Sequence, residues 1–291
     1  MTEEKKPRLI VRGDSHGDNA SAFSYKQFPK FRELDENDTV IILGDTAIGW
    51  PDSDKTTEYV AKNLAMKPFN VIYMFGNHDN YDFAAGLDYS HMASTIYNCP
   101  KMKRLSVNGK SYFNQYVVDE PCIADIAGYH CLLIPGADSH DIDSICFPSK
   151  KPSYTSRMFR EQFFRVIGKT WWPQEAINTT ALYKLLADNE DHFDLVLSHD
   201  CPAYFTEIAS PHGGGEPRMV PTVGEKYLQA LAETLDYDSW FHGHFHYDLF
   251  PYHNPARADH HYDCCCLYHF PYEVEELREI LDNMWFQKFK E

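Results

Sequence analysis

The sequence predicts an α/β fold in which buried strands alternate with helices. Short apolar runs, most of them rich in β-branched or aromatic residues, recur along the 291 residues. Such runs are typical of buried strands, and the longer mixed segments between them are long enough to form helices. Regular alternation of the two kinds of segment favours a layered α/β architecture.

Six runs are expected to be strands and five segments are expected to be helices. The predicted strands are Leu9–Val11, Thr39–Leu43, Val71–Phe75, Cys131–Ile134, Leu195–Leu197 and Trp240–Phe241. The predicted helices are Ala20–Leu34, Lys55–Met66, Pro173–Ala187, Glu225–Leu235 and Pro271–Phe289. Pro173 followed by Glu175 suits the first turn of a helix, where a missing N–H costs nothing and an acidic side chain is favourable.

Two segments are predicted to be irregular surface loops. Residues 136–156 are rich in Asp, Ser and Pro, and residues 210–222 contain Gly213–Gly215, which form either a lid over a site or a plain flexible loop. Neither segment is long enough to be a separate domain, and the sequence contains no internal repeat. We therefore expect one domain over residues 1–291, with insertions at these two places.

Composition and charge exclude several classes of protein. The formal net charge of −16 argues against extended duplex nucleic acid as a partner, because such binding depends largely on Lys and Arg side chains that neutralise phosphates. No stretch approaches the roughly 18 apolar residues of a membrane span, and no apolar run precedes Leu9. The eight cysteines include the run Cys264–Cys266 and no CxxC pair, which indicates free thiols. We expect a cytoplasmic protein without a membrane partner.

The candidate functional residues follow the ends of five predicted strands. Because sites in α/β sheets form outside the carboxyl ends of strands, these five clusters could converge on one crevice. Imidazole and carboxylate ligands together suit zinc, iron or manganese. The clusters are Gly13–Asp18, Gly44-Asp45, Gly76–Asp79, Ser198–Asp200 and His242–His246.

Each cluster alone also has an ordinary structural interpretation. Asp14-Ser15-His16 fits a polar turn, Gly44-Asp45 a helix cap, and Gly76–Asp79 an Asx-type turn. His199 fits a structural histidine, and three histidines within His242–His246 can arise by chance. All five clusters nevertheless occur at strand ends, and this conjunction favours a metal site.

The ordered motifs resemble the calcineurin-like metallophosphoesterase family. They are Asp-x-His-Gly, Gly-Asp, Gly-Asn-His-Asp, a single His after a strand, and Gly-His-x-His, spanning Gly13 to His246. The resemblance implies a two-sheet β-sandwich flanked by helices and a pair of divalent metal ions (manganese, iron or zinc). It implies that the first ion binds Asp14, His16, Asp45 and His246, and that the second binds Asp45, Asn77, His199 and His244.

The same resemblance implies a mechanism. Asp45 would bridge the two ions, and a metal-bound hydroxide would attack the phosphorus atom. The catalytic residues would be His78, which stabilises charge or protonates the leaving oxygen, and Asn77, which places it. Asp79 would either orient His78 or cap a helix.

The sequence departs from the protein Ser/Thr phosphatase branch of that family. Thr46–Trp50 replace the x-x-Asp-Arg-Gly continuation that follows Gly-Asp there. The pattern around Asn77–Asp82 and Trp171–Glu175 is more similar to a bacterial and phage-associated branch. We therefore expect small phosphomonoesters or phosphodiesters, including nucleotides, as substrates, and the sequence identifies no protein partner.

Other functions and sites remain open from the sequence. The alternatives are a nuclease, which would need a basic channel, an inactive scaffold that binds a protein partner, and a closed structural metal site. Trp171-Trp172 is interpreted as core or loop anchoring, with base stacking as the alternative. Four arginines are interpreted mainly as solvated charges, with phosphate binding as the alternative: Arg157, Arg160, Arg165 and Arg218. His260, His261, Cys264–Cys266 and His269 are interpreted as strand residues in preference to a second zinc site.

Overall fold

Two six-stranded sheets form the centre of the computed structural model, which describes residues 5–50, 54–139, 144–146, 164–189, 192–208, 221–254 and 263–288. The first sheet has the order β14-β1-β2-β3-β5-β4, and the second has the order β12-β13-β11-β10-β7-β6. The strands of the first sheet are β1 (Leu9–Arg12), β2 (Thr39–Leu43), β3 (Asn70–Met74), β4 (Lys103–Val107), β5 (Lys110–Val118) and β14 (Tyr272–Glu273). Those of the second sheet are β6 (Cys122–Ile126), β7 (Tyr129–Ile134), β10 (Phe193–Ser198), β11 (Tyr237–His242), β12 (Phe250–Tyr252) and β13 (Cys264–Cys266).

The inner strands of each sheet run parallel to one another. β1, β2, β3 and β5 pair in parallel, as do β7, β10, β11 and β13, while β14, β4, β12 and β6 pair antiparallel at the outer edges. Parallel strands end at one edge of their sheet, so the residues that follow β1, β2 and β3 emerge side by side. The same holds for those that follow β10 and β11.

The sheets pack face to face because their central strands are apolar on both faces. In β2, Ile41 and Leu43 point into the core between the sheets, where they meet Leu197 of β10. Val40 and Ile42 point to the opposite face and pack against helices. Successive side chains of a strand alternate between its faces, so a continuous apolar run is buried on both sides.

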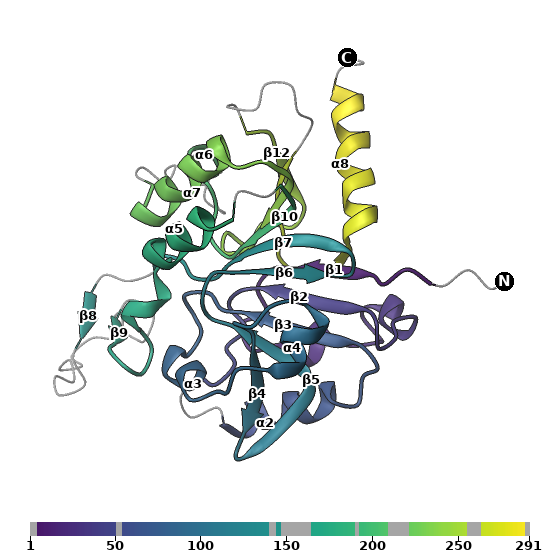
Figure 1. Ribbon diagram of the computed structural model, residues 1–291, viewed down its shortest axis with the longest axis vertical. Helices are drawn as coiled ribbons and strands as arrows, with labels where there is room; N and C mark the ends of the chain where they lie inside the picture. Colours follow the sequence, from purple (N-terminus) through teal and green to yellow (C-terminus); the bar gives the residue numbers. More distant parts are fainter. Residues whose placement is uncertain are drawn as a thin grey trace, which may run out of the picture.

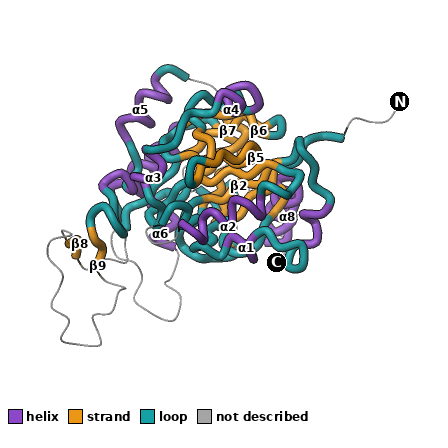
Figure 2. The backbone as a smooth tube through the Cα atoms, turned by 90° about the horizontal axis from the view of Figure 1, so that it is seen from below, coloured by secondary structure: helices purple, strands orange, loops and turns teal. Residues whose placement is uncertain are grey.

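Helices cover the outer faces of the two sheets (Figure 1). α2 (Asp54–Leu64) lies on the first sheet, and α5 (Thr179–Ala187), α6 (Ala203–Ile208) and α7 (Val223–Thr234) lie on the second. The remaining helices are α1 (Asn19–Ala22), the 3-10 turns η1 (Pro29–Arg32) and η3 (Pro173–Glu175), α3 (Tyr81–Ala85), α4 (His91–Ile96) and α8 (Val274–Lys288). The parallel pair β8 (Ser144–Cys146) and β9 (Phe164–Val166) lies at the periphery in both views (Figures 1 and 2).

The predicted fold class, an α/β sandwich of two sheets flanked by helices, is confirmed. Each of the six predicted strands lies within an observed strand, except that Phe75 follows the end of β3. The prediction of one domain over 1–291 stays a prediction. Most of segments 136–156 and 210–222 lies outside the described residues, and within the first of them residues 144–146 form β8. No helix among the described residues combines the length and the apolarity needed to cross a membrane.

The predicted helix Ala20–Leu34 is wrong. The structure has only α1 and the turn η1 in this segment. Pro29 disfavours a helical conformation in the residue before it, and Phe28 is indeed non-helical with φ −125° and ψ 80°. The side-chain hydroxyl of Ser24 also accepts a hydrogen bond from the amide of Lys26 at 3.2 Å, which competes with helix formation.

The predicted helix Pro173–Ala187 is interrupted. η3 ends at Glu175, and Ala176 is extended with φ −65° and ψ 145°. α5 begins after Asn178, whose side chain accepts a hydrogen bond from the amide of Ala181 at 3.0 Å. An asparagine at this position satisfies an amide that the first helical turn leaves unpaired. The carboxyl of Glu175, just before the break, accepts a hydrogen bond from Ser139 in the segment that follows β7.

Candidate metal centre

The structure brings all eight predicted site residues to the carboxyl edge of the two sheets. β1 leads to Asp14 and His16, β2 leads to Asp45, and β3 leads to Asn77 and His78. From the second sheet, β10 leads to His199, and β11 leads to His244 and His246. The two edges are joined directly, because the amide of His244 donates to Oδ1 of Asp14 at 2.9 Å.

The donor atoms form two groups. In the first, atoms of Asp14, His16 and His246 lie within 4.8 Å of one another, and Nε2 of His246 is 3.1 Å from Oδ2 of Asp14. In the second, atoms of Asp45, His199 and His244 lie within the same 4.8 Å limit. The separation matches the sorting of the predicted ligands into two sets.

Asp45 lies between the groups and faces both. Its Oδ1 is 3.2 Å from Nε2 of His199, and its Oδ2 is 3.8 Å from Nε2 of His16. Each carboxylate oxygen is therefore directed to a different group, as a bridging ligand requires.

Three lone pairs converge in the second group. Nδ1 of His199 donates to the carbonyl of Leu43 at 2.7 Å, so Nε2 of the neutral ring carries a lone pair. That nitrogen lies 3.2 Å from Oδ1 of Asn77 and 3.2 Å from Oδ1 of Asp45. Three acceptors in contact repel one another unless a cation or a proton lies among them. The donor chemistry of this group therefore fits a metal ion.

The pKa shifts of His199 and Asp14 also indicate that this site favours a positive charge. Burial alone would lower the pKa of His199, but the carboxylates of Asp45 and Asp14 raise it to about 10. Burial would raise the pKa of Asp14, yet the hydrogen bonds with His16 and His246 hold it well below its usual range. In a site without metal, protonated histidines neutralise these carboxylates. A divalent ion would take the same place, because a histidine ligand binds through its unprotonated nitrogen.

Tight backbone geometry makes this convergence possible. Four predicted ligands adopt the left-handed conformation, with φ values of 44° for His16, 49° for Asp45, 68° for His244 and 56° for His246. Such conformations cost about 1–3 kcal/mol each in non-glycine residues and cluster at functional sites. At Gly76, a Cβ atom would lie 2.3 Å from Oδ1 of Asp45 and 2.4 Å from Nε2 of His199, so a side chain there would displace both groups.

His78 is held beside the two groups without belonging to either. Its amide donates to Oδ1 of Asp45 at 2.8 Å, and its ring centroid lies 5.3 Å from that of His16. Trp50 stacks on His78 with ring centroids 6.2 Å apart, and a guanidinium nitrogen of Arg165 lies 2.8 Å from Nε2 of His78.

The interpretation of Arg165 as a solvated charge is wrong. It is only 5% exposed, and its NH1 group donates to the carbonyls of Thr170 at 2.8 Å and of Asn77 at 3.3 Å. Arg157, Arg160 and Arg218 lie outside the described residues. The sequence gives no signal for the contact between Arg165 and His78, because the two residues are 87 positions apart and Arg165 belongs to no motif.

Asp79 does not have the predicted helix-capping role, and its side chain joins two of the loops that carry site residues. Its Oδ1 accepts a hydrogen bond from the hydroxyl of Thr46 at 2.7 Å, and its Oδ2 accepts one from the amide of Gly76 at 2.8 Å. Burial raises its pKa to about 7. The cap of α3 is Asn80, not Asp79. Asp79 therefore ties the end of β2 to the end of β3 and fixes the loops that carry Asp45 and Asn77.

The remaining predictions concern residues away from the site. Cys264–Cys266 form β13, as the strand interpretation required, but His269 lies in a bend between β13 and β14, so the strand interpretation is wrong for that residue. His260 and His261 lie outside the described residues. Trp172 is buried, and its Nε1 donates to Asp82 at 2.9 Å, in agreement with an anchoring role.

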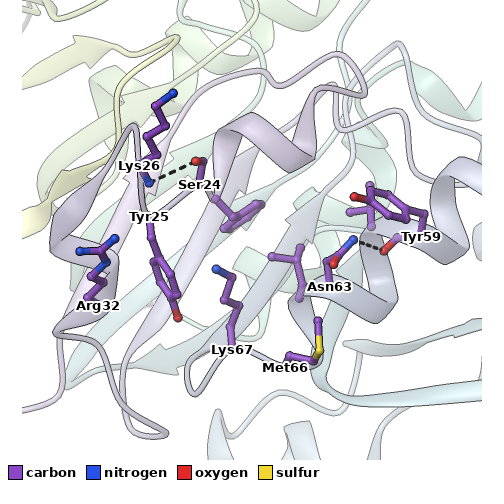
Figure 3. A pocket seen from close by; sticks show the side chains of 11 residues that line it. Ser24, Tyr25, Lys26, Arg32, Tyr59, Asn63, Met66 and Lys67 are labelled. Atoms are coloured by element: carbon purple, nitrogen blue, oxygen red, sulfur yellow. Dashed lines mark hydrogen bonds between the residues drawn. The ribbon is translucent and has the colours of Figure 1, made fainter.

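A groove of about 580 Å³ lies elsewhere, between the segment that follows α1 and the end of α2. Figure 3 shows Tyr25, Lys67 and Tyr59 along it, and Nζ of Lys67 lies 3.2 Å from the ring centroid of Tyr25. None of the eight predicted site residues lines this groove. It is therefore separate from the metal centre.

The sandwich fold and the edge cluster of carboxylates and histidines define a metal-dependent hydrolase that acts on phosphoesters. More particularly, the chain belongs to the calcineurin-like phosphoesterase family, whose pattern matches residues 7–248. Members of this family generally bind two divalent metal ions, and the two donor groups are candidate ligands for them.

Two solved structures of enzymes are similar to this chain at a low level. Phosphopantetheinyl hydrolase (PptH) from Mycobacterium tuberculosis is 12% identical, with a TM-score of 0.40 over 90% of this chain and 88% of that chain. A protein serine/threonine phosphatase from Saccharomyces cerevisiae, with similarity to human phosphatase PP5, is 12% identical, with a TM-score of 0.30 over 92% of this chain and 68% of that chain. No curated protein matches the chain.

Proposed function

We propose that this protein hydrolyses phosphomonoesters or phosphodiesters of small molecules or nucleotides at a pair of divalent metal ions. The observation that carries the proposal is the position of Asp45, whose oxygens lie 3.2 Å from His199 and 3.8 Å from His16. In this assignment Asp14, His16, Asp45 and His246 hold one ion. Asp45, Asn77, His199 and His244 hold the other. Manganese, iron and zinc suit this mixture of imidazole and oxygen ligands.

When bound, such a pair lowers the pKa of a coordinated water and neutralises the phosphate oxygens. The chain's own residues supply the remaining chemistry. The amide of His78 bonds to Asp45 and its ring lies 5.3 Å from that of His16, so His78 is placed next to the donor groups to stabilise charge on the phosphate or to protonate the leaving oxygen. The guanidinium of Arg165 adds a permanent positive charge at the same place.

The proposed substrate class rests on the residues around Asp45. Thr46 follows Asp45 and donates a hydrogen bond to Asp79. The sequence lacks the Asp-Arg-Gly continuation, so this loop supplies no arginine to the phosphate. Trp50 instead stacks on His78 and forms an aromatic wall beside it. An aromatic wall with a nearby guanidinium supports a small ester or a nucleotide as substrate, and the net charge of −16 argues against extended duplex nucleic acid.

The test is reconstitution of metal-free protein with manganese, iron or zinc, followed by metal analysis and a substrate screen. The screen should contain nucleotides, cyclic nucleotides, sugar phosphates, aryl phosphates and phosphopeptides. We expect two equivalents of metal, hydrolysis of small esters, loss of activity with a chelator and recovery with manganese. Asp45→Asn should lose metal and activity together.

Three outcomes would contradict parts of the proposal. Full metal content and activity in Asp45→Asn would refute the bridging role. Phosphopeptide turnover above that of every small ester would refute the substrate class. A wild-type protein that holds two metals and hydrolyses nothing would indicate a scaffold.

A further inference from the structure

We propose that Ser139 and Glu175 are positioning residues that fix the side-chain amide of Asn77 with its oxygen toward the second metal ion. This inference rests on the proposed function, because it concerns how the chain prepares one of the proposed ligands. Ser139 belongs to no motif of the sequence, and Glu175 is the last residue of the Trp171–Glu175 pattern. Both come from the segment between β7 and α5.

The side chains of Asn77, Ser139 and Glu175 are hydrogen-bonded in series, and each bond is donated in the direction from Asn77 toward Glu175. Nδ2 of Asn77 donates to Oγ of Ser139 at 3.1 Å. A serine hydroxyl that accepts this bond has its own proton available, and Ser139 donates it to Oε1 of Glu175. The carboxyl oxygen of Glu175 is therefore the acceptor at the end of the chain. Because the two ends of an amide have opposite hydrogen-bonding character, this order leaves Oδ1 of Asn77 facing His199 at 3.2 Å.

The reverse orientation of the amide would be unfavourable on both sides. It would turn the NH₂ group of Asn77 toward the place where a cation is expected. It would also set Oδ1 against Oγ of Ser139, whose proton is engaged by Glu175. Asn77 is fully buried, so water cannot compensate for either mismatch.

Glu175 is itself rigidly held, which allows it to determine the orientation of its partners. Its backbone carbonyl accepts a hydrogen bond from the amide of Ala137 at 2.7 Å, which joins η3 to the loop that carries Ser139. Its own amide donates to the carbonyl of Trp172 at 3.0 Å, and its side chain is 1% exposed. A buried carboxyl is costly unless it is hydrogen-bonded, and here Oε1 accepts from Ser139 while Oε2 accepts from the amide of Trp172 at 3.5 Å, which fixes the carboxyl at both oxygens.

The decisive experiment is a manganese titration of metal-free protein by calorimetry, together with metal analysis after dialysis. Ser139→Ala removes the acceptor of the Asn77 amide. We expect the affinity of one of two manganese sites to fall by about 10–100-fold, the usual effect of losing a residue that orients a ligand. Ser139→Thr retains the hydroxyl and should retain the affinity. Ser94→Ala removes a half-buried hydroxyl that donates to the carbonyl of Ser90 at 3.4 Å, away from the site, and it should change nothing.

A double-mutant cycle separates positioning from a general structural role. If Ser139 acts through Asn77, the double variant Asn77→Ala/Ser139→Ala should bind manganese as weakly as Asn77→Ala alone. Additive losses would overturn the proposal, and so would an unchanged titration of Ser139→Ala. If Ser139→Ala proves unstable, Glu175→Ala and its conservative partner Glu175→Gln, whose Oε1 still accepts the serine proton, give the same comparison. Failure of the wild type to bind two ions would refute the proposed function instead.

Discussion

A guanidinium nitrogen of Arg165 lies 2.8 Å from Nε2 of His78, although 87 positions separate the two residues in the sequence. The other terminal nitrogen of Arg165 donates to the carbonyl of Thr170 at 2.8 Å, which anchors the side chain. The first of these two nitrogens also lies 3.2 Å from Nδ1 of His78, and because arginine only donates, the ring nitrogen that bonds to it must carry a lone pair. This contact fixes the ring of His78 next to the proposed metal ligands.

The first prediction follows from that contact. Arg165→Lys keeps the charge but loses the planar fork that reaches Thr170 and His78 together. We expect kcat/KM for an aryl phosphate to fall by about 10–100-fold through misplacement of His78, with metal content unchanged. Arg104→Lys is the control, because Arg104 is a half-buried arginine that donates to the hydroxyl of Ser90 at 3.0 Å, away from the site. Loss of metal in Arg165→Lys would show that the arginine supports the ligands themselves.

The second prediction concerns His78. His78→Asn should lower turnover by roughly 10²-fold or more, within the range for general acid catalysis. The metal content of the variant should stay at the wild-type value, because the amide of His78, which the substitution retains, is the group that bonds to Asp45. Metal analysis and steady-state kinetics on the same preparation test both parts. A variant that loses an ion would place His78 among the ligands.

The third prediction uses Gly76. A Cβ atom at this position would lie 2.3 Å from Oδ1 of Asp45 and 2.4 Å from Nε2 of His199, so Gly76→Ala must displace both proposed ligands. We expect loss of metal binding and a lower free energy of unfolding, by about 1–3 kcal/mol for an overpacked site. Gly86→Ala is the control, because its Cβ would meet only the carbonyl of Phe83 at 3.5 Å. Normal metal affinity in Gly76→Ala would contradict the close packing of this loop.

The proposed ligands could be identified from the sequence because each lies within a short motif directly after a buried strand. Once β1, β2, β3, β10 and β11 are parallel in their sheets, the positions of Asp45 and His199 follow from topology alone. The fold class was accessible for the same reason, since apolar runs such as Thr39–Leu43 are buried on both faces.

The surroundings of the ligands could not be identified in this way. Arg165, Ser139 and Glu175 come from a segment with no regular apolar pattern, and their contacts join positions that lie far apart in the sequence. The helix predicted at Ala20–Leu34 was wrong for a local reason, because helical spacing of apolar residues does not register the effect of Pro29 on Phe28. The short edge strands β12 and β14 are set by pairing with neighbours and carry little signal of their own.

The last prediction concerns the base of the sheet that carries the site, where Asp38 joins β1 to β2. Its buried carboxylate accepts hydrogen bonds from the amide of Arg8 at 2.8 Å, from NH2 of Arg8 at 2.8 Å and from the amide of Asp35 at 2.9 Å. Burial alone would raise the pKa of Asp38, but these bonds outweigh it and hold the pKa below its usual value. The ionised form is therefore the one that stabilises the fold.

A depressed folded-state pKa gives stability that is fully present above the unfolded value near pH 4 and is lost as the pH falls through the folded value. Asp38→Asn should lower the free energy of unfolding of the metal-free protein at pH 7 by about 1.5–3 kcal/mol, the contribution of a hydrogen bond to a charged group. The difference from wild type should shrink steadily below about pH 4, because the wild-type carboxylate then takes up a proton as well. Urea unfolding at a series of pH values measures both curves. Glu36→Gln changes an exposed carboxylate two residues away and should follow wild type. If the gap between Asp38→Asn and wild type stayed constant down to pH 2, the loss would come from packing and not from the charge of Asp38.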